Sequence, residues 1–147
     1  MNPQIVVRQA EQSDAAVIEA HLRMAKDESH QYRGTPFALN DAPTRTYVAI
    51  VGDTPVGSLS LIEEIDGNAT ICLVFVEAEA REIGVGDSLL SYAMKDLVGR
   101  GFVRISASAQ PGDRSLKNLF ERHGLVAQTI LVGRSLSDLS TEARASQ

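Results

Sequence analysis

The chain has 147 residues and a mass of 15.8 kDa, which is the length of a single domain. Hydrophobic residues make up 44% and charged residues 22%, a globular composition that excludes a disordered chain. The single cysteine, Cys72, excludes an internal disulfide framework and a Cys-rich zinc site, and no metal is expected. One free thiol suits a reducing compartment, so we expect a cytoplasmic protein.

Charge and hydropathy restrict the partners of the chain. Lys and Arg total 14 against 19 for Asp and Glu, a net charge of −5. Nucleic-acid-binding domains normally carry a basic excess, so no nucleic-acid partner is expected. The longest purely apolar run, Ile71 to Val76, is far too short to span a bilayer. No basic flank leads into an apolar stretch at the start, so neither a membrane partner nor a secretory signal is expected.

The first third of the chain predicts a strand, a helix and a loop. Residues 5–8 form a β-branched run typical of a strand. A helix follows, with Ser13 as its cap and Asp14 where the helix dipole favours a negative charge. Its apolar residues recur at helical spacing: Val17, Ile18, Leu22 and Ala25. Residues 31–45 are polar and contain glycine and proline, which indicates a loop.

Three consecutive strands are predicted next, over residues 46–51, 56–62 and 69–76. Turns at residues 52–55 and at Asp66–Gly67 separate them, and the second is a favoured hairpin turn because both residues tolerate positive φ. The third strand is apolar on both sides of its alternation, which is typical of a central strand.

The last third alternates helices and strands. A helix with one apolar stripe starts at about Gly86, and a strand is predicted over residues 102–109. Asp113 caps a short helix that Gly124 closes, and residues 126–132 are predicted to form a last strand.

This order of elements predicts a mixed α/β fold, with a mixed sheet and helices on its faces. We expect a single domain over residues 1–136 and a polar, Ser-rich tail over residues 137–147.

The most informative segment is Arg81-x-x-Gly84-x-Gly86, between a buried strand and a helix. A helix N-terminus presents unpaired N–H groups, glycines allow close approach of a phosphate, and Arg81 can add a charge-assisted contact. A tight strand-to-helix turn would use the same glycines. A dinucleotide-binding fingerprint needs glycine where Leu89 stands, and a P-loop needs Gly-Lys-Ser/Thr where the chain has Gly86-Asp87-Ser88.

The chain as a whole resembles the GNAT-type N-acetyltransferases, which transfer acetyl from acetyl-CoA to an amine. Residues 81–86 match the Arg/Gln-x-x-Gly-x-Gly/Ala signature of that family at every fixed position, although a proline often stands where this chain has Ala78. Residues 113–125 are similar to a second family pattern around Asn118, Phe120 and Gly124. The resemblance covers roughly residues 5–135.

The resemblance implies a GNAT-like fold: a mostly antiparallel sheet of about six to seven strands, splayed between strands four and five, with about four helices. It implies acetyl-CoA as the acetyl donor. Its pantetheine arm would pair with the backbone of Val74, Phe75 and Val76, and its pyrophosphate would lie on the loop N–H groups. The residues expected to bind acetyl-CoA are Val74, Phe75, Val76, Arg81, Glu82, Ile83, Gly84, Val85, Gly86 and Asp87. Arg114 and Lys117 either reach the anionic donor or form a solvated helix face.

The catalytic residues are open in this resemblance. A backbone N–H near Val76, at a bulge in the fourth strand, is the expected oxyanion donor. Many family members have a tyrosine acid where this chain has Phe120, and some carry a glutamate base in the neighbourhood of Thr70. Either another residue or water supplies the proton, or activity is low. The alternative is a catalytically weak regulatory module that binds acetyl-CoA or CoA.

The expected acceptor is a primary amine of a small molecule or a protein. Residues 27–45 would form one wall of its site, with Glu28, Tyr32 and Arg33 as candidate contacts. Many family members pair, so a homodimer fits the resemblance, although no oligomer signal is visible in the residues.

Overall fold

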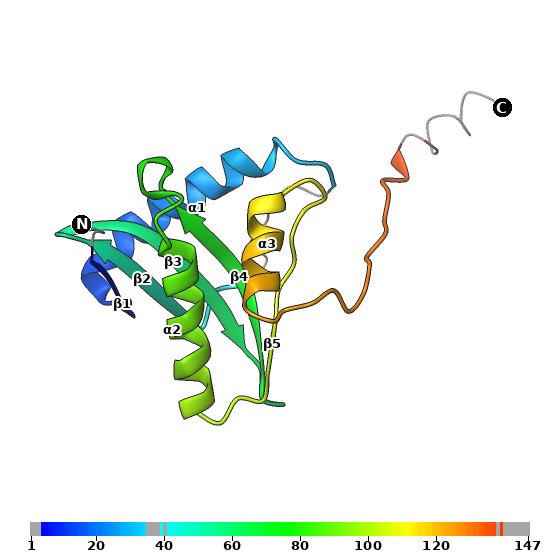
Figure 1. Ribbon diagram of the computed structural model, residues 1–147. Coiled ribbons are helices and arrows are strands. Elements are labelled where there is room, and N and C mark those ends of the chain that lie inside the picture. Colours follow the sequence, from blue (N-terminus) through cyan, green and yellow to red (C-terminus); the bar gives the residue numbers. More distant parts are fainter. Residues whose placement is uncertain (1–3, 35–38, 40, 138, 140–147) are drawn as a thin grey trace.

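The computed structural model describes residues 4–34, 39, 41–137 and 139, and it forms one mixed sheet with helices on both faces (Figure 1). The strands are β1 (Ile5–Gln9), β2 (Arg45–Val51), β3 (Thr54–Glu63), β4 (Asn68–Val76) and β5 (Arg104–Ser106). The α-helices are α1 (Ala15–Ser29), α2 (Val85–Gly99) and α3 (Arg114–Arg122), and short 3-10 turns lie at Gln12–Asp14 and Ala78–Ala80.

The five strands lie in the order in which they occur in the chain. The first four are antiparallel neighbours, whereas β5 is parallel to β4. β5 pairs only with Asn68, Ala69 and Thr70 at the beginning of β4. From Ile71 onward, β4 therefore has no described strand on that side. The splay between the fourth and fifth strands is confirmed.

The helices cover the sheet because each presents an apolar stripe to one face. α1 packs behind β3 and β4, and α2 crosses the opposite face (Figure 1). The stripe of α2 supplies Leu89, Leu90, Ala93 and Leu97 to the core, all at most 3% exposed. α3 adds Leu119 and Phe120 to the same core beside the start of α2.

β4 is apolar along nearly its whole length because α1 and α2 cover its two faces, and a bulge interrupts its pairing with β3. Ser60 faces Leu73 while Leu61 faces Ile71, so Cys72 is the extra residue. Beyond the bulge, side chains change face. The bulge was expected near Val76, and the structure places it at Cys72 instead. Cys72 itself is partly buried, and burial raises the pKa of its thiol.

The sequence predictions hold for the elements whose apolar side chains reach the core. Several predictions of detail are wrong. Ser13 does not cap α1, since Asp14 at the N-cap instead accepts from the N–H of Glu11. The strand predicted over residues 102–109 shortens to Arg104–Ser106, and residues 126–132 form no strand. The described sheet therefore has five strands rather than six or seven, and the described part has three α-helices rather than four.

Candidate functional site

The loop before α2 forms a cradle of backbone N–H groups. Glu82 and Gly84 both have positive φ, at 71° and 92°. Among the described residues, no N–H from Glu82 to Asp87 makes a backbone hydrogen bond of good geometry. The first N–H groups of a helix have no partner within it, and the helix dipole makes this end positive. The cradle therefore suits an anion such as a phosphate.

Asp87 places a carboxylate at the cradle, and α3 neutralises it. Arg122 donates two hydrogen bonds of 3.1 Å to Asp87, and His123 Nε2 lies 2.8 Å from its Oδ1. The Arg122 hydrogen bonds are the main reason that the pKa of Asp87 is lowered. These contacts also fix the end of α3 against the start of α2.

Arg81 connects the cradle to the sheet and to α1. Its Nε donates to the carbonyl of Val76 at 2.8 Å, and its guanidinium donates to Glu28 at 2.6 Å. It also lies 5.6 Å from the centre of the Phe75 ring. The Arg81 guanidinium, which the sequence predicts to contact an anion, is thus bound to protein groups in this structure.

The open edge of β4 presents backbone groups beside the cradle. Glu77 donates its N–H to the carbonyl of Val56 at 2.8 Å, and Val76 lies opposite Gly57. In that register, the N–H and C=O of Val76 point away from β3, and those of Val74 do the same. They face the side from which β5 is splayed; the carbonyl of Val76 already accepts from Arg81 there, and an extended chain could pair with the remaining groups.

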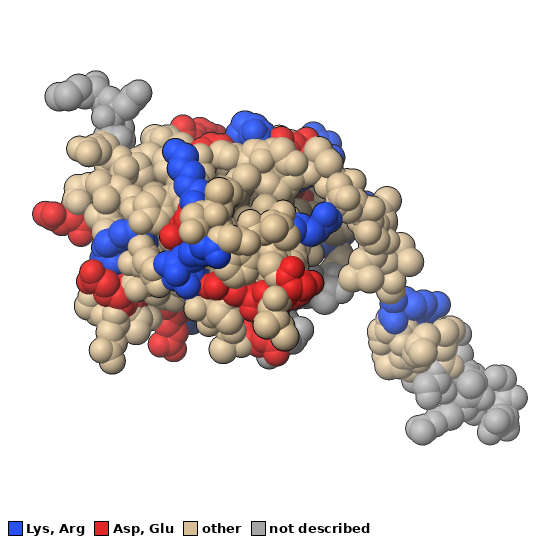
Figure 2. All heavy atoms as spheres, turned by 90° about the horizontal axis from the view of Figure 1, so that it is seen from below, with Lys and Arg blue, Asp and Glu red and all other residues tan. Residues whose placement is uncertain are grey.

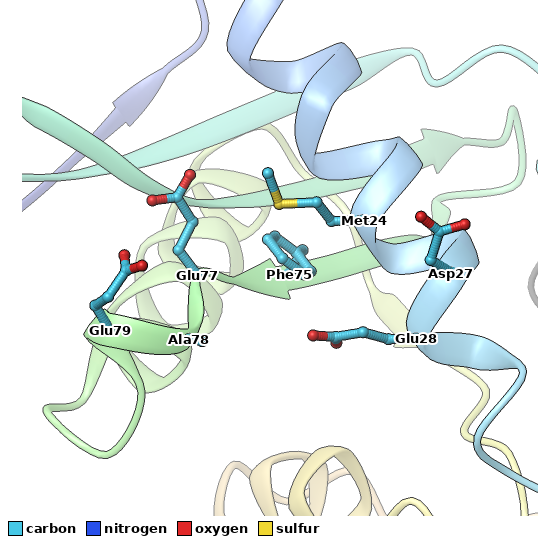
Figure 3. A pocket seen from close by; sticks show the side chains of 7 residues that line it. All are labelled: Met24, Asp27, Glu28, Phe75, Glu77, Ala78 and Glu79. Carbon is cyan, nitrogen blue, oxygen red and sulfur yellow. The ribbon is translucent and has the colours of Figure 1, made fainter.

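An acidic hollow of about 360 Å³ lies between α1 and the end of β4 (Figure 3). Phe75 lies at its centre, with Met24 and Glu28 reaching in from α1 and Glu77 from the end of β4 (Figure 3). The lining residues are Met24, Asp27, Glu28, Phe75, Glu77, Ala78 and Glu79. Four of the seven are acidic, so the hollow suits a cation.

One of these carboxylates is held by a buried histidine. Nε2 of His21 lies 3.2 Å from Oε1 of Glu77, and its Nδ1 lies 2.5 Å from the hydroxyl of Ser58. His21 and Ser58 are both 0% exposed, and the His21 ring lies against the Phe75 ring, tilted by 41° with ring centres 5.2 Å apart. With Nε2 protonated, His21 donates to Glu77 and accepts from Ser58. This chain fixes Glu77 at the hollow.

Two aromatic residues, Phe120 and Tyr32, are relevant to the general acid that the resemblance places at position 120. Phe120 is only 7% exposed and packs in the core, so its ring is structural. Tyr32 follows α1 and is partly buried, and this burial raises the pKa of its phenol. The carboxylates of Asp113 and Glu28 raise that pKa further, so Tyr32 keeps its proton at neutral pH.

The structure gathers some of the predicted site residues and separates others. It brings Glu28 to the hollow and leaves Arg33 exposed. Lys117 pairs with Glu121 at 3.6 Å. On the face seen in Figure 2, acidic and basic side chains are interspersed rather than gathered by sign. No described helix is both long and apolar enough to cross a bilayer, and no cluster of three metal-ligating side chains lies within the described residues.

No local sequence motif indicates Glu77, which lines the hollow, or His21 and Ser58, which are linked to Glu77 by hydrogen bonds. A signal was present, because His21 falls within the apolar stripe of α1 and Ser58 within a strand of buried residues. A polar side chain at a core position needs a hydrogen-bond partner, so the sequence already indicates that His21 and Ser58 are hydrogen-bonded, although it does not indicate to which residue.

Comparison with known proteins agrees with this geometry. The chain matches the Acetyltransferase (GNAT) family over residues 8–125, and it belongs to that family. No curated protein matches it in sequence.

Solved structures share the fold at low identity. An aminoglycoside acetyltransferase, meta-AAC0020, from an uncultured soil metagenomic sample has a TM-score of 0.67 at 15% identity, covering 89% of this chain and 94% of that one. The aminoglycoside N-acetyltransferase AAC(6')-Iy in complex with CoA has a TM-score of 0.70 at 10% identity, covering 92% and 97%. The ribosomal-protein-alanine N-acetyltransferase from Brucella melitensis biovar Abortus 2308 has a TM-score of 0.67 at 17% identity, covering 89% and 99%.

Proposed function

We propose that this protein transfers acetyl from acetyl-CoA to a cationic primary amine of a small molecule or a protein. The observation that carries the proposal is the run of unpaired N–H groups from Glu82 to Asp87 beside the open edge of β4. A phosphate cradle next to unpaired strand backbone fits a donor with a pyrophosphate and an amide-bearing arm. The family of the chain and its structural relatives support acetyl-CoA as that donor.

The acceptor would enter the acidic hollow. An alkylamine has a pKa of about 10.4, so it arrives as a cation and must be deprotonated before or during attack on the thioester. The carboxylates of Asp27, Glu77 and Glu79 favour binding of that cation, whereas Glu28 is already paired with Arg81. As the C–N bond forms and the C–S bond breaks, Glu77 takes the proton of the amine while His21 holds its other oxygen.

The backbone N–H of Val76 would stabilise the oxyanion, since it faces the splayed side of β4. The leaving thiolate needs a proton, which Phe120 cannot supply. Tyr32, protonated at neutral pH, or water takes that role. Loss of a general acid typically costs about 10²–10⁴-fold, and a thiolate leaving group tolerates the loss better than an alkoxide.

The proposal is tested by calorimetric titration with acetyl-CoA of the protein and of the variants Ile83→Glu and Ile65→Glu. Ile83 lies in the cradle loop and is 40% exposed, so a glutamate there adds repulsion without removing core packing. We expect micromolar binding, weakened about tenfold or more in Ile83→Glu by a carboxylate near a phosphate. Ile65, in the β3–β4 turn, is fully exposed, and its variant should bind as the parent does. Equal affinity of all three proteins would contradict the cradle assignment.

A regulatory module that binds acetyl-CoA without turnover is the second candidate, and the buried Phe120 in place of an acid favours it. Release of CoA measured against a panel of amines distinguishes the two. Turnover of any cationic amine above the blank supports the transferase. Binding without turnover for every amine supports the module.

A further inference from the structure

Arg81 contacts groups that belong to both proposed sites. Its Nε donates to the carbonyl of Val76 at 2.8 Å, on the strand edge where the arm of the donor would pair. A terminal nitrogen of the same side chain donates at 2.6 Å to Glu28, a carboxylate that lines the acidic hollow. One guanidinium therefore occupies a carbonyl of the donor site and a carboxylate of the amine site at the same time.

The guanidinium lies toward the hollow rather than over the cradle. Its carbon is 5.6 Å from the centre of the Phe75 ring, and Phe75 lies at the centre of the hollow (Figure 3). Glu28 reaches toward the same ring from α1 (Figure 3). The N–H groups of the cradle begin at the next residue of the chain, Glu82, so a phosphate bound there would lie within reach of the long Arg81 side chain.

The contact between Arg81 and Glu28 is weak enough to be exchanged. The two side chains are 43% and 36% exposed, so solvent screens their attraction. A phosphate offers a guanidinium two parallel charge-assisted hydrogen bonds and a larger negative charge than a single carboxylate. An anion in the cradle would therefore compete successfully with Glu28 for Arg81.

Movement of Arg81 to a phosphate would change both sites. The carbonyl of Val76 would become free to accept from an amide of the donor arm. Glu28 would lose its cation, and a positive charge would leave the side of the hollow. The hollow would then attract a cationic amine more strongly, because one more of its carboxylates is unpaired.

We propose that Arg81 is a latch between the two sites, closed when it binds Glu28 and Val76 and open when it binds the phosphate of the donor. The inference rests on the proposed function, since it requires a phosphate-bearing donor in the cradle and a cationic amine in the hollow. Coupling between two binding sites is reciprocal, so a cation held by Glu28 strengthens donor binding by the same factor. The affinity of each site thus depends on the occupancy of the other through one side chain.

The test is calorimetric titration with acetyl-CoA of the parent protein, Glu28→Gln, Arg81→Gln and the double variant. Glu28→Gln removes the charge that retains Arg81, so we expect its affinity for acetyl-CoA to rise about two- to fivefold. In the Arg81→Gln background the same change should bring no such gain, because no guanidinium is left to release. Glu79→Gln is the matched control, because it removes the same charge from the same hollow, and it should change the affinity less than about twofold.

A second titration measures the coupling from the amine side. The probe is butylamine, followed by NMR with and without saturating CoA, which carries no acetyl group and allows no turnover. CoA should raise the affinity of the parent protein for butylamine more than it raises that of Arg81→Gln.

Two results would overturn the latch and leave the proposed function intact. Weaker binding of acetyl-CoA by Glu28→Gln would mean that the ion pair supports the cradle instead of competing with the donor. Equal effects of Glu28→Gln in the presence and absence of Arg81 would mean that Arg81 does not couple the sites. Failure of the parent protein itself to bind acetyl-CoA would contradict the proposed function, and the latch with it.

Discussion

Glu77 is the carboxylate of the acidic hollow that touches a buried histidine, and this contact distinguishes it from its neighbours. In Glu77→Gln the amide cannot take a proton from the attacking amine, although the side chain keeps its size. We expect kcat to fall by about 10²–10³-fold, and the rise of the rate with pH that reports the base to flatten. The measurement is the pH profile of kcat with an amine that the parent protein acetylates.

Glu79→Gln is the matched comparison, because Glu79 lines the same hollow, whereas the carboxylate hydrogen-bonded to Nε2 of His21 is that of Glu77. This change removes one charge from the wall. It should raise the KM for a cationic amine while the shape of the pH profile is kept. If the two variants change kcat and KM alike, Glu77 is one charge among several and not the base.

At the residue scale, a local motif indicates the glycine loop as a candidate anion site, whereas no local motif indicates the contact between Glu77 and His21. Gly84 and Gly86 belong to a local pattern in which a strand, a loop and a helix follow one another. Glu77 and His21 are 56 residues apart, and only the packing of α1 on the sheet brings them together. Local spacing carries no information about such a pair.

At the element scale, Tyr47 fastens α2 to the sheet. Its hydroxyl donates to Asp96 at 2.6 Å, and the Tyr47 side chain is fully buried. A hydrogen bond to a charged group contributes about 1.5–3 kcal/mol. When the Tyr47 hydroxyl is removed, Asp96 keeps its hydrogen bond from Arg100 at 3.0 Å, which reduces the cost of the change. We expect Tyr47→Phe to lower the free energy of unfolding by about 1–2 kcal/mol.

Urea unfolding checks this, with a lower midpoint at an unchanged slope. Tyr92→Phe is the control. Tyr92 lies edge-on to Tyr47 with ring centres 5.7 Å apart, is 41% exposed, and should change stability by less than about 0.5 kcal/mol. Equal stability of the two variants would show that the Tyr47 hydroxyl contributes nothing.

The elements that the sequence predicted well are those whose own apolar residues pack into the core. α2 has an unbroken apolar stripe, and β2 to β4 are joined by short turns that fix their register. Residues 126–132 have an equally good strand pattern but form no strand. A strand forms only where a neighbouring strand offers backbone groups to pair with, and the sequence of the segment does not show whether such a neighbour is present.

At the scale of the whole molecule, several carboxylates make stability depend on pH. The Arg8 hydrogen bonds, at 2.7 and 3.1 Å, are the main cause of the lowered pKa of Asp14, which is 6% exposed. Burial would raise the pKa of Asp96, but hydrogen bonds from Tyr47 and Arg100 outweigh it, and the pKa is lowered. A lowered pKa means that the folded state binds the proton less readily than the unfolded chain does.

The stabilisation by these groups is therefore complete above the unfolded pKa of about 3.9 and is lost as the pH falls through the lower folded values. We expect the free energy of unfolding to decline from about pH 5 downward. Asp14→Asn should lower the free energy of unfolding by about 1–3 kcal/mol at pH 7. The stability of this variant should decline less steeply in acid than that of the parent protein, since the contribution of Asp14 is already absent. Urea unfolding between pH 3 and pH 7 measures the free energy of unfolding of the parent protein and of Asp14→Asn, with Asp53→Asn in an exposed turn as the control. Parallel curves for Asp14→Asn and the parent protein would mean that Asp14 contributes no acid sensitivity, and the decline would then have to come from Asp87 and Asp96.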